Sequence, residues 1–496
     1  MPDSLLKTRL SNGTEVRRVA VGLWQMADQE RDGRAYDLDT AAERLADYAR
    51  SGLDTFDMAD HYGSAEIVAG KAARILEAEG RAAPVIMTKW CPAPGPMDKA
   101  TVRKGVETAL ERLGRDRIDV MQFHWWRYES PEYMDALEHL QELRNEGLIS
   151  GVGLTNFDSQ HLRMIAKHGI DIVSNQVCFS LLDRRAAGGL AAVSEDLGVG
   201  IFGFGTLCGG FLSERWLDKT EPQDLPDWSR MKYKRFVDTV GGWDRLQSLL
   251  RVLSDIAARH EVSVSNVATR WILAQKALAS VIVGVRLGEN DHRDDNLRLL
   301  SFDLDDSDLA AIAQATDMLD PVPGDCGDEY RKPPFLTASG DLSHHLDALP
   351  PVHAVRDVGH RQIASSGSIW EARAGFSRAI RDGNRILVSG TTATDPHGNP
   401  IAVDDAEAQT VYILDKISAA ITSLGGTLND VIRTRIYIQD PSHWESVSEV
   451  HQRYFGDVMP ANTLVSASLI GPYLVEIEAE AQLSGDERVQ SDGSGN

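Results

Sequence analysis

Short apolar runs alternate with amphipathic stretches throughout the N-terminal part of the sequence. The apolar runs lie at residues 18–24, 55–58, 85–89, 119–124, 150–154, 171–176, 200–204 and 281–285. Strands that alternate with helices predict an α/β protein with a parallel sheet. Eight such units within roughly 300 residues favour a closed (β/α)8 barrel. The alternative, an open doubly wound sheet, requires a glycine-rich turn after its first strand, which Gly22-Leu23-Trp24 does not provide.

Four polar residues lie near the ends of the second, third and fourth strands. They are Asp57, Tyr62, Lys89 and His124. Each alone has an ordinary structural explanation, such as a helix cap, a turn aromatic, a solvated lysine or a packed histidine. A phenol has a pKa of about 10, so it donates protons usefully at neutral pH only when a cation lies beside it. Together, at successive strand ends, the four residues predict a proton-transfer site.

With these residues in place, the sequence up to about residue 320 resembles the aldo-keto reductase family. The resemblance implies a TIM barrel, NADP(H) as the cofactor, and reduction of a carbonyl to an alcohol. It implies that Tyr62 donates a proton to the carbonyl oxygen and that Lys89 lowers the pKa of Tyr62. Asp57 would hold and neutralise Lys89, and His124 would orient the substrate oxygen.

Later strand ends resemble the cofactor contacts of that family. Thr155 and Asn156 stand at the nicotinamide-binding pair, Gln176 at the amide-binding glutamine, and Phe204 at the aromatic that stacks on the nicotinamide. Gly284, Arg286 and Asn296 stand where the adenosine 2′-phosphate and adenine are held. A phosphate suits a helix N-terminus with an arginine fork. For Phe204 the alternative is plain barrel core, and for Arg286 a surface salt bridge.

Tryptophans follow several strand ends. We expect Trp24, Trp90 and Trp125 to wall an apolar substrate pocket, the alternative being that some of them pack under loops. The long polar stretch 209–242, after the seventh strand, is expected to be a functional or mobile loop. The proline-rich stretch 321–365 is expected to be an inter-domain connector, with Tyr330 and Phe335 packed on the barrel surface rather than in the site.

Charge and cysteine content limit the partners and the compartment. The net charge is −23, from 51 basic and 74 acidic residues, which argues against nucleic acid or an anionic membrane as the main partner. The four cysteines lie far apart, which fits a reducing cytoplasm better than disulfides or a zinc site. We therefore expect a cytoplasmic protein without a metal.

A second periodic pattern begins near residue 366. It predicts strands at 384–389, 431–439, 463–469 and 474–482 and helices at 405–424 and 441–455, an α+β domain. In the strand predicted at 431–439, the side chains expected on the buried face are Ile432, Thr434, Ile436 and Ile438. The final residues, 485–496, are expected to be a disordered tail.

This domain resembles the RidA/YjgF family, which has a chorismate mutase-like fold. The resemblance rests on Val388-Ser-Gly-Thr391, Gly425–Val431, Pro460-Ala-Asn462 and Val475–Ala479, and covers about 366–484. Asn462 replaces the arginine that binds a substrate carboxylate in the imine-hydrolysing members. Glu476 matches their acidic residue, so these two would mark the cleft of the domain. The resemblance also implies a trimer-based homo-oligomer.

Three functions follow as hypotheses. The first is an NADPH-dependent reductase, or its reverse, acting on an aldehyde or ketone. The second couples imine or enamine hydrolysis in the C-terminal domain to carbonyl reduction in the barrel. The third is a non-enzymatic sensor that binds NADPH and regulates a partner.

Overall fold

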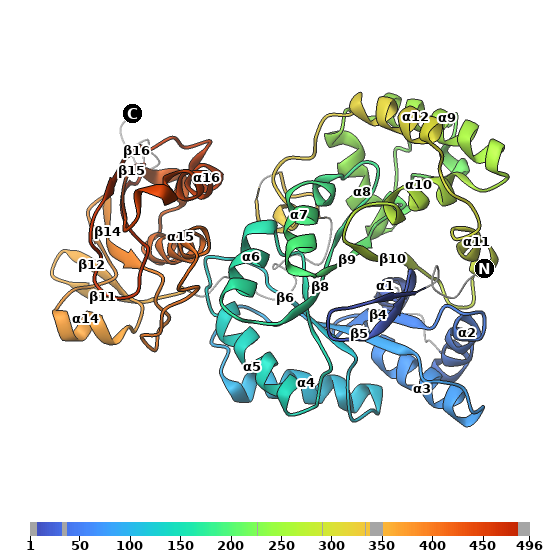
Figure 1. Cartoon of the computed structure of the whole chain (residues 1–496), viewed down its shortest axis with the longest axis horizontal. Helices are drawn as coiled ribbons and strands as arrows, with labels where there is room; N and C mark the ends of the chain where they lie inside the picture. Colours follow the sequence, from blue (N-terminus) through green and yellow to red (C-terminus); the bar gives the residue numbers. More distant parts are fainter. Residues whose placement is uncertain are drawn as a thin grey trace, which may run out of the picture.

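The N-terminal domain is a closed barrel of eight parallel strands, in the order β10-β3-β4-β5-β6-β7-β8-β9, with helices around it (Figure 1). The computed structural model describes residues 7–31, 37–225, 227–289, 291–332, 334–337 and 351–484. The predicted TIM barrel is confirmed. Its strands are β3 (Val19–Gly22), β4 (Thr55–Ala59), β5 (Val85–Trp90), β6 (Val120–His124), β7 (Val152–Thr155), β8 (Ile172–Cys178), β9 (Gly200–Phe204) and β10 (Leu278–Gly284).

The helices of this domain follow the strands in chain order. They are α1 (Trp24–Arg31), α2 (Leu38–Arg50), α3 (Ala65–Ala78), α4 (Lys99–Leu113), α5 (Tyr133–Asn145), α6 (Ser159–Lys167), α7 (Gly189–Leu197), α8 (Trp228–Thr239), α9 (Trp243–His260), α10 (Val264–Leu273), α11 (Arg293–Arg298), α12 (Asp306–Asp317) and α13 (Asp328–Arg331). Asp305 caps α12 as predicted, and its side chain accepts from the Asp308 amide.

A hairpin closes the end of the barrel at which the strands begin. It pairs β1 (Lys7–Arg9) with β2 (Glu15–Arg17) around the predicted Asn-Gly turn. Leu10 and Val16 pack with Val120, Val173 and Phe202 in a small apolar cluster. The opposite end of the barrel, where the strands finish, stays available for the site.

The stretch 209–242, expected to be a loop, contains helix α8 and two short 3-10 turns. Asp227 begins α8 by accepting a hydrogen bond from the Arg230 amide. Tyr233, Phe236 and Val237 of α8 are buried in a second apolar cluster with α9 and α10. The loop prediction failed because the polar residues of α8 outnumber this narrow apolar stripe.

The second domain is a seven-stranded mixed sheet in the order β11-β12-β13-β14-β17-β15-β16. Its elements are β11 (Ala354–Val358), β12 (Arg361–Ser365), α14 (Ile369–Ala374), β13 (Ala379–Asp382), β14 (Arg385–Thr392), α15 (Ala406–Ser423), β15 (Val431–Ile438), α16 (Trp444–Phe455), β16 (Ala461–Ser466) and β17 (Val475–Gln482). The predicted RidA/YjgF-like α+β domain is confirmed.

Two predictions about this domain need correction. The sheet begins at Ala354, inside the expected connector. The sequences of the edge strand β11 and of its neighbour β12 lack apolar alternation, and every residue of β11 is exposed. In addition, Ile432 is 47% exposed, because the pairing of β15 with β17 shifts between Val431 and Arg433. A one-residue shift moves a side chain to the other face. Part of the expected connector, 338–350, and the expected tail, 485–496, lie outside the described residues.

Helix α15 joins the two domains. Its residues are buried on all sides, as expected for a helix enclosed within a larger structure. One side covers β14 and β17, and another lies against α6 of the barrel (Figure 1). The two domains therefore share one continuous apolar core.

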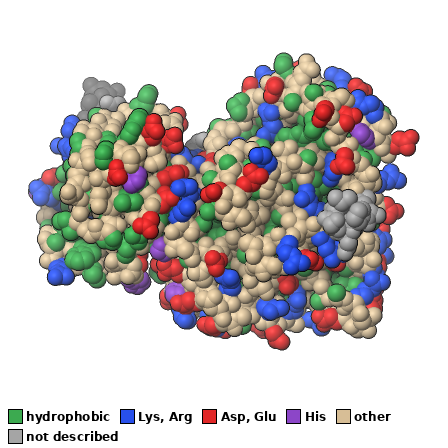
Figure 2. Space-filling view, viewed as in Figure 1, with side chains coloured by type: hydrophobic (Ala, Val, Ile, Leu, Met, Phe, Trp, Pro, Cys, Tyr) green, Lys and Arg blue, Asp and Glu red, His purple; other side chains and the backbone are tan. Residues whose placement is uncertain are grey.

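Acidic and basic side chains are mixed over the surface shown in Figure 2, and apolar side chains gather on the second domain. Exposed apolar residues of that domain include Phe376, Ile432 and Val465. Among the described residues, none of the helices combines the length and the apolar character needed to cross a membrane.

Candidate active site

A buried ion pair lies between neighbouring barrel strands. Lys89 Nζ, on β5, is 2.9 Å from Asp57 Oδ1 and 2.8 Å from Asp57 Oδ2, on β4. Asp57 Oδ1 also accepts from Gln122 Nε2 at 2.9 Å and from Gln176 Nε2 at 2.6 Å. A buried ion pair is retained only when its remaining hydrogen-bonding capacity is met, and the two amides meet it here.

Tyr62 lies above this pair, in the turn between β4 and α3. Lys89 Nζ is 5.0 Å from the centre of the Tyr62 ring, and Trp24 packs edge-on with 5.2 Å between ring centres. Burial raises the pKa of the Tyr62 hydroxyl well above its ordinary value, and the charge of Asp57 adds to the rise. The net shift of the Tyr62 pKa is therefore upward, with burial as its largest cause, and the expected lowering by Lys89 stays a prediction. The phenol keeps its proton at neutral pH, as a proton donor must.

His124 ends β6 on the same side of the barrel. Its Nδ1 is 3.2 Å from the carbonyl oxygen of Thr155, and a carbonyl can only accept, so Nδ1 carries a hydrogen. Nε2 is then an acceptor in the neutral ring and a donor in the protonated ring. The ring centres of Trp126 and Tyr330 lie 4.4 and 5.7 Å away. His124 is thus held in one orientation by its backbone contact and its aromatic neighbours.

One cavity of about 630 Å³ joins these groups. It is lined by all four predicted catalytic residues, namely Asp57, Tyr62, Lys89 and His124. It is also lined by every predicted cofactor residue, namely Thr155, Asn156, Gln176, Phe204, Gly284, Arg286 and Asn296. The structure therefore brings together at one end of the barrel residues that are up to 239 positions apart in the sequence, from Asp57 to Asn296.

The cavity wall has groups that suit a nicotinamide dinucleotide. Thr155 Oγ1 and Asn156 Oδ1 are buried without a hydrogen-bond partner among the described residues, and buried polar atoms of this kind need one. The carboxamide of nicotinamide supplies matching donors and an acceptor. Arg215, Arg230 and Arg286 line the same cavity and offer the planar fork that binds phosphates.

Of the three tryptophans expected at the pocket, only Trp24 lines the cavity. Trp125 is fully buried elsewhere, and its Nε1 donates to the carbonyl of Ser130 at 2.8 Å. Trp90 packs against Phe123, 5.7 Å between ring centres. Neighbouring residues of a strand point to opposite faces, so Trp90 points away from the face that Lys89 occupies. Trp126, one residue further than expected, lines the cavity instead.

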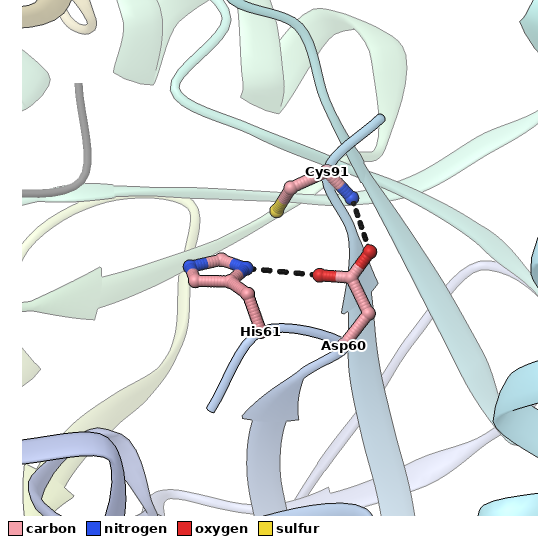
Figure 3. A group of neighbouring side chains, drawn as sticks. All are labelled: Asp60, His61 and Cys91. Carbon is pink, nitrogen blue, oxygen red and sulfur yellow. Dashed lines mark hydrogen bonds and ion pairs between the residues drawn. The ribbon is translucent and has the colours of Figure 1, made fainter. Parts of the chain in front are cut away.

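A small polar cluster, Asp60, His61 and Cys91, fixes the turn that carries Tyr62 (Figure 3). Asp60 accepts from His61 Nδ1 at 2.9 Å and from the Cys91 amide at 3.0 Å. The three potential metal-binding atoms lie within 4.8 Å of one another. Burial raises the pKa of the Cys91 thiol well above its ordinary value. The hydrogen bonds therefore serve to join the β4–α3 turn to the end of β5.

The two residues predicted to mark the second cleft are not brought together in one chain. Asn462 Nδ2 donates to Thr434 Oγ1 at 2.9 Å, on the buried face of the sheet, since Thr434 is fully buried. Glu476 alternates with the buried Val475 and Ile477 and so lies on the opposite face. The sequence-based reasoning missed Arg378, a buried arginine whose charge acts on Glu476.

Other residues of the barrel site were also missed. Lys232 and Tyr330 line the cavity, and Lys232 Nζ is 2.8 Å from Tyr330 Oη. Tyr330 was expected on the surface, but only Phe335 is there, at 52% exposure. Both missed residues belong to short helices outside the strand–helix repeat, so no strand end signals their position.

Barrel, site and cavity together define a TIM-barrel oxidoreductase. The chain belongs to the aldo/keto reductase family, whose model matches residues 18–317. Residues 367–483 match the family model described as endoribonuclease L-PSP, which confirms the RidA/YjgF resemblance.

Individual relatives match either the barrel part or the C-terminal part of the chain. The NADH-specific methylglyoxal reductase of Escherichia coli (strain K12) is 24% identical over 333 residues, 61% of this chain and 95% of that protein. A RutC family protein of Pyrococcus horikoshii is 36% identical over 107 residues, 21% of this chain and 85% of that protein. The structure of a glycerol dehydrogenase from Gluconobacter oxydans superposes with a TM-score of 0.54 at 22% identity, covering 65% of this chain and 98% of that one.

Proposed function

We propose that the barrel is an NADPH-dependent reductase of an aldehyde or ketone, with Tyr62 as the general acid. The observation that supports this most directly is the Asp57–Lys89 pair beneath the Tyr62 ring, in a cavity shared with His124. A protonated phenol beside a fixed cation has the chemistry needed to give a proton to an oxygen that is gaining charge.

The proposed reaction assigns a step to each side chain. When bound, the nicotinamide supplies a hydride to the carbonyl carbon. As the C=O π electrons move to oxygen, Tyr62 transfers its proton to that oxygen, and the alcohol is formed. Lys89 stabilises the phenolate left behind, and Asp57 keeps Lys89 in position. His124 holds the substrate oxygen, donating from Nε2 when protonated and accepting from the alcohol when neutral. The reverse sequence is alcohol oxidation.

We further propose that NADPH is preferred over NADH. Arg286 pairs with Glu289 at 3.7 Å, and Arg286 and Arg215 both line the cavity, which supports guanidinium contacts to a 2′-phosphate. The Escherichia coli relative is named as NADH-specific, so the cofactor preference of this chain has to be measured. A lower Kd for NADPH than for NADH in wild type, lost in Arg286→Ala, is the expected result; equal Kd values would contradict it.

The main test is oxidation of NADPH over a panel of aldehydes and ketones by wild type and Tyr62→Phe. We expect Tyr62→Phe to lower kcat by roughly 10²–10⁴-fold, the range for loss of a general acid, with little change in NADPH binding. Tyr437→Phe, a tyrosine on β15 of the second domain, is the matched control and should keep full activity. Equal turnover by wild type and Tyr62→Phe would eliminate the mechanism.

For the second domain we propose a role in assembly, through the sheet face that α15 and α16 leave open, and a trimer-based oligomer in the cytoplasm. That face carries Arg433, Arg435, Glu478 and Glu480 around a surface cavity. Mixed charges and exposed apolar residues suit contact between copies. Light scattering on the full chain checks the mass; a monomer at micromolar concentration would contradict the proposal.

A further inference from the structure

A half-buried ammonium lines the cavity. Lys232 lies on α8, and its Nζ is 2.8 Å from Tyr330 Oη on α13. It also lies 5.1, 5.3 and 4.9 Å from the ring centres of Phe204, Tyr233 and Tyr330. The Tyr330 ring is in turn next to His124, with 5.7 Å between ring centres. The ammonium is therefore close to the predicted catalytic residues.

Within the ranges that the structure describes, no carboxylate forms an ion pair with Lys232. Glu329, the neighbour of Tyr330, is bound by Arg185 at 2.8 Å instead. By contrast, Lys234, on the same helix, pairs with Glu221 at 2.6 Å and with Asp238, and Lys89 pairs with Asp57. Lys232 is thus a half-buried lysine that contacts one phenol and three aromatic faces and has no ion pair among the described residues.

The ammonium nevertheless keeps its charge. Burial lowers the pKa of Lys232, but Tyr330 and the nearby acidic groups outweigh that effect, and the pKa lies above its ordinary value. An ammonium has three donors, and Tyr330 takes one of them. An aromatic face attracts a cation more weakly than an anion does in a dry site.

We propose that Lys232, held in place by Tyr330, binds a carboxylate of the carbonyl substrate. The preferred substrates would then be aldehydes or ketones that carry a carboxylate within a few bonds of the carbonyl. This inference rests on the proposed reductase function and specifies its substrate class. A single ammonium and a single phenol match one negative charge, which favours a carboxylate over a phosphate.

The kinetic test compares 4-formylbenzoate with its methyl ester, which has the same aldehyde but no charge. For Lys232→Met we expect KM for 4-formylbenzoate to rise about 10–100-fold, the value of a hydrogen bond to a charged group, with kcat within a few-fold of wild type. KM for the ester should change little, and Lys232→Arg should recover part of the loss. Lys234→Met, on the same helix, should leave KM for both substrates unchanged.

A binding experiment needs no turnover and separates this inference from the proposed function. Benzoate should bind wild type at least tenfold more tightly than Lys232→Met by calorimetry, and Tyr330→Phe should fall between them. The Kd for NADPH should be the same in all three. Equal benzoate affinities, equal losses on both aldehydes, or a raised Kd for NADPH in Lys232→Met would overturn the carboxylate assignment. Equal turnover by wild type and Tyr62→Phe would instead overturn the reductase function.

Discussion

At the barrel site, one carboxylate, that of Asp57, holds several other side chains in position. Asp57 accepts hydrogen bonds from Lys89, Gln122 and Gln176, which come from three different strands. Its removal leaves the Lys89 ammonium buried without an anion. Breaking a buried ion pair from one side is far more costly than replacing both partners by apolar groups.

We therefore expect Asp57→Ala to lower the free energy of unfolding of the barrel by roughly 3–5 kcal/mol. Adding Lys89→Met should recover a large part of that stability, since no buried charge remains, but should not recover activity. Thermal unfolding and NADPH oxidation of the single and double variants measure the two effects. If the double variant is as unstable as the single one, the pair is not the source of the stability.

The kind of strand or helix that carries a residue explains which predictions from sequence succeeded. The barrel strands were predictable because each is a continuous apolar run, and the residues Asp57, Lys89 and His124 could be found because strand ends of a closed barrel converge. Trp125 was expected at the cavity because it follows a strand end. Whether a side chain there points into the cavity or away from it depends on the alternation of β6 up to its last residue, His124. Lys232 could not be found, since it comes from a helix inserted between β9 and α9 that has no counterpart in the repeat.

At the start of α15, one aspartate has two roles that substitution can separate. Asp405 caps the helix by accepting from the Ala408 amide at 2.9 Å, and it pairs with Arg163 of the barrel at 2.5 Å. Asn is as good an N-cap as Asp, so Asp405→Asn should lose only the partly exposed pair, at about 0–1 kcal/mol. Asp405→Ala should cost about 0.5–2 kcal/mol more. Urea unfolding measures both; equal losses would show that the cap does not contribute.

The whole molecule is held together by a polar network between the domains. Asp415 of α15 accepts from His161 Nε2 at 3.0 Å and from Tyr133 Oη at 2.7 Å, both in the barrel. Arg453 of α16 bridges Asp158 and Asp325 at 2.7 and 2.8 Å. Burial lowers the pKa of His161, but Asp158 and Asp415 outweigh it and leave the pKa above its ordinary value. The buried His161 ring therefore lies between two carboxylates at the domain contact, and these favour its charged form.

This arrangement predicts a pH dependence. A group whose pKa is raised by folding stabilises the protein fully below its unfolded pKa, about 6.5 for histidine, and this contribution disappears as the pH rises through the folded pKa. The stability difference between wild type and His161→Gln should therefore be largest near pH 6 and should shrink as the pH rises.

Thermal unfolding of the two proteins across this range measures that difference. Lys416, whose pKa is lowered to about 7, titrates over part of the same range. It is present in both proteins, so its contribution cancels in the difference. A difference that does not vary with pH would show that His161 is not charged at the contact.

Helix α15 lies within the apolar core that the two domains share, since it packs on the sheet of its own domain and on α6 of the barrel. Separating the two domains would leave the apolar faces of α15 and α6 that now contact each other without a partner. Exchange of the C-terminal half for another RidA/YjgF protein would therefore fail unless the donor helix carried matching residues toward the barrel.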